Sequence, residues 1–403
     1  MKNTDVLISG GGIAGPALAY WLHRAGFTVT VVERAPAPRP GGQTVDLRGA
    51  GRTVVTRMGL MERARELSVD QRGMAFVNGS GRVTARMPAD GFGGEGIVSE
   101  IEILRGDLGA LLYEASLPHT EYLFDNTITA LDEDEDGITV AFKRGAPRRF
   151  DLVVGADGLH SAVRSVAFGP EAAHVRPLGV HTAWFTTHGE LDLDGWFLMH
   201  NAPGGLVASA RPGRLPGEIK AGFSFRSGPL DLDRRDLIAQ RAELDRRFAG
   251  VGWEAPRLLR AMHEAPDFFL DSMGQVRLDS WSRGRVVLLG DAGYCPTPLT
   301  GLGTSLALVG AYVLAGELAA AGGEFDPAFR AYDRVMRPYV DRAQQLPPGG
   351  ASGYAPSSAF AIRMRDLSMR SMNRWPMRQL LAAQFAKAGD IALPDYDFAT
   401  AHH

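Results

Sequence analysis

The first 34 residues contain a short apolar run, a glycine-rich turn, a stretch with apolar residues at helical spacing, and a second apolar run. Residues 6–8 and 29–32 have the length and composition of buried strands, and residues 13–25 have apolar positions at helical spacing. The turn between the first strand and this helix contains three glycines, Gly10, Gly12 and Gly15. This order of strand, tight turn, helix and strand is typical of a βαβ unit that binds a dinucleotide.

Each glycine of this unit has a physical role. Gly10 permits the sharp turn, Gly12 lets the backbone approach a pyrophosphate, and Gly15 allows the helix to pack closely on the strands. The free amides at the start of the helix then point at the phosphates. Glu33 follows the second strand and can accept hydrogen bonds from ribose hydroxyls, which favours NAD or the adenosine half of FAD over a 2′-phosphate.

Turn residues and periodicity divide the next part of the chain. The proline- and glycine-rich residues 35–43 predict a connector, and residues 52–68 predict helices that break at Gly59. A hairpin is expected around Asn78-Gly79, and an amphipathic helix is expected to begin at Arg105. The acidic run 132–136 favours a solvated turn over a metal loop, because its acids lack ligand spacing. We therefore expect no metal site.

Long alternating runs between His174 and Val276 predict an antiparallel sheet with one covered and one open face. Helices are expected near 233–249 and 256–263, and Pro376 is expected to interrupt a final helical segment. The predicted boundaries are 1–72, 99–173 and 275–345 for a discontinuous nucleotide-binding domain, 73–98 and 174–274 for an inserted substrate-binding domain, and 346–403 for a C-terminal linker and helix.

Composition narrows the class of protein. A formal net charge of −3 offers no general basic surface, so nucleic acid is not an expected partner. The single cysteine, Cys295, excludes an internal disulfide and fits a reducing compartment, which predicts a cytoplasmic protein. The apolar stretch 305–316 ends at Glu317 and is too short for a membrane span. Monomer and dimer both remain open.

Two further glycine–acid motifs occur far from the first. Residues 151–164 end a predicted strand in Gly155-Ala156-Asp157-Gly158 and then open a helix. Residues 286–308 end a strand in Gly290-Asp291 and then pass through Pro298 and Gly301-Leu302-Gly303 into a helix. In both motifs a carboxylate and bare backbone can face a sugar or a phosphate chain.

As a set, the three motifs with Glu33-Arg34 and with Arg105 in "ILRGDL" resemble the class A flavoprotein monooxygenases, the family of p-hydroxybenzoate hydroxylase. The resemblance covers roughly residues 5–342. Residues 41–60 look most like the tetracycline-inactivating monooxygenases and aromatic-polyketide hydroxylases. The implied fold is α/β, with a Rossmann-like FAD-binding domain of the p-hydroxybenzoate hydroxylase type, an inserted antiparallel-sheet substrate domain and a C-terminal helical segment.

The resemblance also implies which residues contact the cofactor FAD. Glu33 holds the adenosine ribose, Asp291 the ribityl or diphosphate part, and Arg39 matches a residue implicated in NADPH contact. Free amides near Thr304 can stabilise the negative charge of the reduced flavin. The full implied set is Gly10, Gly12, Ile13, Ala14, Gly15, Glu33, Arg34, Arg39, Asp46, Arg105, Asp157, Gly290, Asp291, Pro298, Gly301, Leu302, Gly303 and Thr304.

In the reaction implied by the resemblance, NADPH or NADH reduces the flavin, O₂ forms a C4a-hydroperoxyflavin, and one oxygen atom passes to a small aromatic, polycyclic substrate. The chemistry belongs to the cofactor, so the protein has to exclude water and orient the substrate. Hydroxylation and Baeyer–Villiger insertion both fit. A flavin-dependent reductase or oxidase on the same fold, and a non-catalytic flavin-binding carrier or partner subunit, are the alternatives.

Substrate contacts are expected from the open face of the predicted sheet. A buried core role for most of its aromatic side chains is the competing interpretation. His200 and Arg211 are the candidates for a general base or a phenolate-binding cation. Cys295 is expected to be a buried, inert thiol. The candidate substrate residues are His181, Trp184, Phe185, His200, Arg211, Phe223, Phe225 and Pro298.

The sequence departs from the family pattern around the third motif. Alanine and histidine are usual at 293 and 294, polar residues at 302 and 305, and an acidic pair at 309 and 310. Contacts at the flavin edge are the expected place for any consequence. The residues present are Gly293, Tyr294, Leu302, Ser305, Val309 and Gly310.

Overall fold

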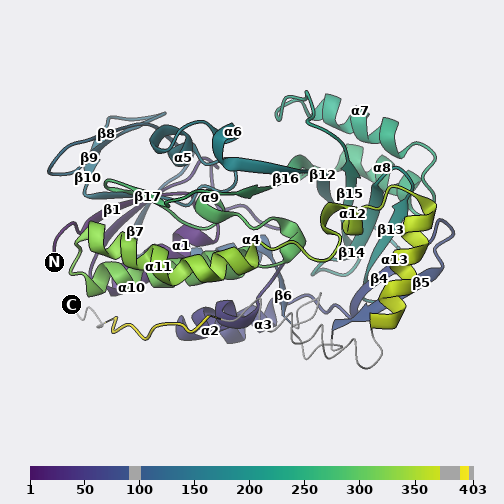
Figure 1. Ribbon diagram of the computed structural model, residues 1–403, viewed down its shortest axis with the longest axis horizontal. Coiled ribbons are helices and arrows are strands. Elements are labelled where there is room, and N and C mark those ends of the chain that lie inside the picture. Colours follow the sequence, from purple (N-terminus) through teal and green to yellow (C-terminus); the bar gives the residue numbers. More distant parts are fainter. Residues whose placement is uncertain (90–100, 373–390, 399–403) are drawn as a thin grey trace.

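The computed structural model describes residues 1–89, 101–372 and 391–398. Figure 1 shows a six-stranded sheet and its helices at one end of the molecule, and a seven-stranded sheet at the other. In the first sheet the strands are parallel except for β17. Its order is β17 (Ser282–Arg283), β18 (Val286–Leu288), β11 (Leu152–Gly155), β1 (Asp5–Ser9), β2 (Thr28–Val32) and β7 (Thr120–Leu123). This sheet confirms the predicted βαβ unit and an α/β fold.

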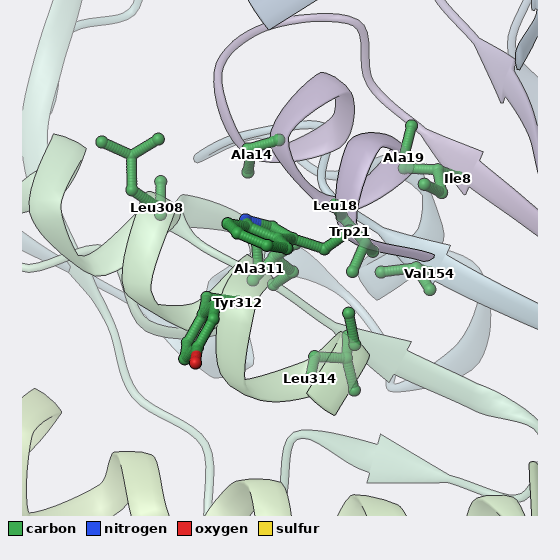
Figure 2. Close-up of a cluster of buried hydrophobic side chains, with 14 of the residues drawn as sticks. Ile8, Ala14, Leu18, Ala19, Trp21, Val154, Leu308, Ala311, Tyr312 and Leu314 are labelled. Carbon is green, nitrogen blue, oxygen red and sulfur yellow. The ribbon is translucent and has the colours of Figure 1, made fainter. Parts of the chain in front are cut away.

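Helices cover this sheet and are themselves packed together. α10 packs on α1, α2 and α11, and is apolar on all sides because it is buried on all sides. Trp21 of α1 meets Tyr312 of α10 edge to face, with ring centroids 5.1 Å apart (Figure 2). The helices are α1 (Ala14–Arg24), α2 (Gly49–Arg57), α3 (Met61–Glu66), α4 (Arg105–Ser116), α10 (Gly303–Ala320) and α11 (Phe325–Ala343).

Of the described residues, α10 alone is long and apolar enough to cross a membrane by length and composition. It spans 18 residues, longer than the sequence predicted, and 72% of them are buried inside the protein. Its side chains therefore form the centre of the core rather than a lipid-facing surface. Tyr396 and Phe398 of the C-terminal segment also pack against this helix.

A small three-stranded sheet holds the acidic turn. Asp134 accepts hydrogen bonds from the amides of Asp136 and Gly137 and forms an ion pair with Arg149. The carboxylate thus caps a hairpin turn, and the described residues contain no metal-binding cluster. The strands are β8 (Ile128–Glu133), β9 (Ile138–Phe142) and β10 (Arg148–Phe150), beside α5 (Ala162–Ala167).

The seven-stranded sheet combines two distant parts of the chain. It is antiparallel except between β13 and β4, which run parallel. Its order is β16 (Phe269–Val276), β12 (Val175–His188), β15 (Glu218–Arg226), β14 (Leu206–Pro212), β13 (Trp196–Ala202), β4 (Gly73–Val77) and β5 (Val83–Pro88). The hairpin β4–β5 joins strands from beyond residue 174, which supports a discontinuous division of the chain; the exact boundaries stay a prediction.

Further elements join the two sheets. A ribbon of β3 (Thr44–Asp46) and β6 (Glu102–Leu104) connects to α2 and α4. Helices α7 (Leu237–Phe248) and α8 (Ala255–Glu264) lie together, as predicted, beside the large sheet (Figure 1). The remaining helices are η2 (Leu117–His119), α6 (Glu171–His174), α9 (Asp291–Tyr294), η3 (Pro298–Thr300), α12 (Gly350–Tyr354) and α13 (Ala359–Met372). The predicted break at Pro376 lies outside the described residues.

Candidate active site

The turn between β1 and α1 is built from backbone in direct contact with backbone. Gly10 has φ +116°, and a Cβ there would overlap the carbonyl of Ala156 in the second motif. A Cβ at Gly15 would overlap the carbonyl oxygen of Gly10. A side chain at Gly10 would therefore displace the loop after β11, and a side chain at Gly15 would push α1 away from the turn.

Positive charge and free amides meet at this turn. α1 has no side-chain cap and no acid in its first turn, so its first amides stay available to an anion. Arg105, at the start of α4, extends its Nη2 to 3.4 Å from the position of a Cβ on Gly12. A cation beside a bare backbone and a helix N-terminus suits a pyrophosphate.

Glu33 is held at the end of β2 by the same turn. Its carboxylate accepts hydrogen bonds from the amides of Gly11, at 2.7 Å, and Ala35, at 2.8 Å. Arg39 Nη2 lies 3.5 Å from the same Glu33 oxygen that accepts from Ala35, whereas Arg34 is exposed. The position fits the predicted ribose contact, and Arg39 lies where a second, mobile nucleotide could meet it.

Asp157 faces inward. It accepts hydrogen bonds from the amides of Ala162, at 2.8 Å, and Val163, at 3.2 Å, and from the Ser161 hydroxyl. Burial raises the pKa of this carboxyl, and these hydrogen bonds oppose the shift. Asp157 therefore anchors the N-terminus of α5 and fixes the loop under Gly10, and its predicted contact with the cofactor stays a prediction.

The third motif brings three elements to one point. A Cβ at Gly290 would lie 3.4 Å from the Cβ of Ala14 in α1 and 3.6 Å from that of Ala307 in α10. Asp291 is solvent-accessible, yet surrounding protein desolvates its carboxyl and raises its pKa, while the charge of Arg105 opposes this shift. An accessible carboxylate at the end of a strand is suited to accept hydrogen bonds from sugar hydroxyls.

The turn that follows carries backbone strain. Thr297 is β-branched and has φ +85°, and its buried hydroxyl has no partner among the described residues. Gly301 has φ +66°, and a Cβ there would lie 3.1 Å from the Asp46 carboxylate. α10 begins at Gly303 with no side-chain cap and no acid in its first turn.

These features fit FAD along its whole length. Glu33 suits the adenosine ribose, the β1–α1 turn and Arg105 the pyrophosphate, and Asp291 the ribityl chain. The uncapped start of α10 suits the electron-rich edge of the flavin ring. The elements that form this glycine cradle are the β1–α1 turn, Glu33, Arg105, Gly290-Asp291 and residues 298–304.

Comparison with known proteins agrees with this geometry. A family model described as "FAD binding domain" matches residues 3–343. A Legionella longbeachae protein named flavin-dependent monooxygenase is 36% identical over 98% of this chain and 99% of its own. The chain belongs to the FAD-dependent monooxygenases. The crystal structure of the tetracycline destructase Tet(55) aligns with a TM-score of 0.81 and 33% identity, over 98% of this chain and 99% of that one. The uncharacterized protein Rv1260 of Mycobacterium tuberculosis is 47% identical over 87% of this chain and 94% of its own.

Three of the residues that depart from the family pattern, Tyr294, Ser305 and Gly310, take part in packing of the core. The Tyr294 hydroxyl lies 2.7 Å from that of Tyr332 in the core, and a Cβ at Gly310 would overlap Tyr294. The Ser305 hydroxyl donates to the Arg48 carbonyl at 3.1 Å, which fixes the first turn of α10 against α2. The absence of a side chain at Gly310 thus leaves the space that the Tyr294 hydroxyl occupies in the core. Cys295 is buried nearby, and burial raises its pKa, so it remains a thiol.

The large sheet has one face in the core. Its cross-strand partners put five candidate substrate residues on the side covered by α7 and α8, where Phe223 meets Phe248 at a ring distance of 4.6 Å. His200 donates through Nδ1 to the Val77 carbonyl, with the tautomer assigned from that partner, and burial lowers its pKa. The packing of α7 and α8 against this face disfavours direct substrate contact by five residues, whose substrate role stays a prediction: His181, Phe185, His200, Phe223 and Phe225.

The opposite face of the sheet carries the other side-chain set. Trp184 is half-buried, and a Cβ at its partner Gly222 would overlap the indole. Arg211 lies between Phe197, 4.8 Å from the guanidinium, and Trp184, at 6.0 Å. Arg211 also reaches the Thr44 carbonyl of β3, at 3.3 Å, so this face meets the ribbon beside Gly301. We define Trp184, Phe197, Arg211 and Lys220 as the aromatic–cationic wall.

Lys220 belongs to this wall although its side chain is buried. Its Nζ lies 2.7 Å from Glu218 and donates to the Thr186 hydroxyl at 2.9 Å. A Cβ at Gly41 would lie 3.8 Å from the same nitrogen, so the connector before β3 passes over it. The chain just before residues 43–46 thus lies against the sheet.

Glu102 is a site residue that the sequence did not reveal. It lies opposite Asp46 in the ribbon and forms an ion pair with Arg211 at 3.3 Å. Desolvation, and then the charge of Asp46, raise its pKa to about 7, against the effects of Arg211 and Arg48. Breaking such a buried pair by removing one partner costs about 3–5 kcal/mol. An acid inside the apolar run before Arg105 was the available signal.

We predict that Asp291→Ala leaves the protein folded but weakens FAD retention. Loss of a hydrogen bond to a charged group costs about 1.5–3 kcal/mol, or roughly 10- to 150-fold in affinity. The measurement is flavin content and the dissociation constant of FAD by fluorescence, with circular dichroism as the check of folding. Asp192→Ala, at an exposed loop position, is the control. Wild-type flavin affinity in the Asp291 variant would refute the assignment.

Proposed function

We propose that this monooxygenase uses NADPH or NADH to transfer one oxygen atom from O₂ to a planar, polycyclic aromatic or tetracycline-like small molecule. When bound, FAD supplies the redox chemistry by the route that the family resemblance implies. The observation that carries the substrate class is the aromatic–cationic wall on the sheet face that meets the ribbon beside the glycine cradle. We further propose a cytoplasmic enzyme.

The residues around the wall suit this task. Trp184 and Phe197 offer faces for stacking, and Arg211 offers a cation for an ionised phenol, enol or carboxylate. The first amides of α10 can stabilise negative charge on the reduced cofactor. Arg211 and the ribbon bring the wall to the cradle, and the proposed reaction requires that water be kept out of this junction.

The tetracycline scaffold is favoured by the likeness to Tet(55), which extends over both domains rather than over the cradle alone. The position that is oxygenated, and the choice between hydroxylation and Baeyer–Villiger insertion, are questions for product analysis. Arg39 beside Glu33 is our candidate contact for the nicotinamide nucleotide.

The test of this proposal is turnover with a defined panel. FAD-loaded protein is mixed with NADPH or NADH in aerobic buffer, with and without phenols, anthraquinones and tetracyclines, while coenzyme oxidation and product mass are followed. The proposal expects polycyclic compounds to accelerate oxidation and to gain one oxygen atom. Coenzyme oxidation that yields only H₂O₂ or a reduced product would instead favour an oxidase or reductase, and a flavin that no compound helps to reduce would favour a carrier.

Neighbouring residues of β12 offer a matched pair of variants for the two sheet faces. We predict that Trp184→Ala raises the KM of an accepted aromatic substrate at least about tenfold, because stacking contacts are lost, while FAD content is unchanged. Phe185→Ala should leave KM near wild type and lower the free energy of unfolding by about 3–5 kcal/mol, because Phe185 is fully buried under α7 and α8. Equal effects of both changes on KM would contradict the assignment of the faces.

A further inference from the structure

A buried ion pair joins the ribbon to the substrate sheet. Glu102 on β6 and Arg211 on β14 are both buried, and Arg211 Nη1 lies 3.3 Å from Glu102 Oε2. Gln71 donates to the other carboxylate oxygen, also at 3.3 Å. The pair therefore spans the boundary between the flavin side of the protein and the wall.

Arg211 is incompletely satisfied by these contacts. Its two hydrogen-bonded partners, Glu102 and the Thr44 carbonyl, both lie at the long distance of 3.3 Å. Its buried Nε has no hydrogen-bond partner among the described residues. A guanidinium with spare donors, placed between Phe197 and Trp184, is suited to a planar anion.

Glu102 is in an unfavourable setting for a carboxylate. Asp46, its cross-strand neighbour, brings a second negative charge, and Arg48 and Arg211 supply the opposing positive charges. Burial adds the cost of removing the carboxylate from water. The balance puts the pKa of Glu102 at about 7, so a small change in its surroundings alters its charge near neutral pH.

We propose that Glu102 is a positioning residue that controls Arg211: as a carboxylate it holds the guanidinium, and on taking up one proton from solvent it releases the guanidinium to an anionic aromatic substrate. The inference rests on the proposed function, since it concerns the substrate pocket of that reaction. It adds control of Arg211 by Glu102 and a proton that is taken up when the anionic ligand binds.

The sign of the pH effect follows from this linkage. Above the pKa of free Glu102 the anion must compete with the carboxylate for Arg211, so affinity falls as pH rises. If binding raises the Glu102 pKa by one pH unit, the affinity at pH 8 is about fivefold weaker than at pH 6. A neutral ligand has no charge to exchange, so its affinity should not change over this range.

The test measures binding without turnover. Anthraquinone-2-carboxylate, with the neutral anthraquinone-2-carboxamide as its matched control, is titrated into FAD-loaded protein by calorimetry at pH 6, 7 and 8. Two buffers of different ionisation enthalpy at pH 7 report the protons taken up. The variants are Glu102→Gln, which keeps the shape of the side chain, and Arg211→Gln, which removes the cation. Arg260→Gln, at an exposed position of α8, is the control for loss of an arginine.

The proposal expects the wild-type protein to bind the carboxylate with proton uptake and with the fall in affinity from pH 6 to pH 8. Glu102→Gln should bind it equally well at all three pH values and without proton uptake, and Arg211→Gln should lose the preference for carboxylate over carboxamide. The proposal is overturned if wild-type binding is independent of pH, if the pH dependence survives in Glu102→Gln, or if the carboxylate binds no better than the carboxamide. The binding test contains no NADPH or NADH and so does not depend on turnover. Its outcome can therefore be interpreted even if the protein fails to transfer oxygen in the turnover assay.

Discussion

The site depends on close backbone packing at the turn between β1 and α1, where glycines have no side chain to keep the chains apart. Gly15 rests on the carbonyl of Gly10, and Gly10 rests on Ala156, so α1, β1 and the loop after β11 have one common position. Asp157 then ties that loop to α5, and Arg164 of α5 donates to the Ala292 carbonyl of α9 at 2.9 Å. The three glycine motifs are thus one connected structure, which explains how segments almost 300 residues apart can form a single cradle.

The periodicity of the sequence was sufficient to predict the elements but not their partners. The βαβ unit, the β4–β5 hairpin, the acidic turn and helices α7 and α8 were predictable, because each depends on local spacing and turn residues. The face of the large sheet was not, because both faces carry aromatic side chains and only tertiary packing decides which one the helices cover. Trp184 lies over Gly222 on the face opposite α7 and α8. This contact could not be predicted, because a glycine indicates a neighbouring ring only when the strand register is known. Glu102 was hidden for a related reason, since its role comes from Arg211, more than 100 residues away.

The fold places different demands on its two halves. On the cradle side, α10 is packed on all sides, and the unusual Tyr294 and Gly310 are accommodated within the core. On the sheet side, α7 and α8 cover one face, and the ribbon, α12 and α13 pack on the other, which also carries the wall. Rigid support on both sides suits chemistry that belongs to a cofactor, because the protein then needs only to hold two planar molecules in register and keep water away.

The most direct test of the account is the source of the oxygen atom in the product. The compound that most strongly accelerates coenzyme oxidation is converted under ¹⁸O₂ in ordinary water, and the product is analysed by mass spectrometry. The account predicts one labelled oxygen atom per product molecule, with the second atom of O₂ recovered as water. A product without the label, formed while the flavin remains bound and is reduced, would contradict oxygen transfer and assign the chain to reductase or oxidase chemistry.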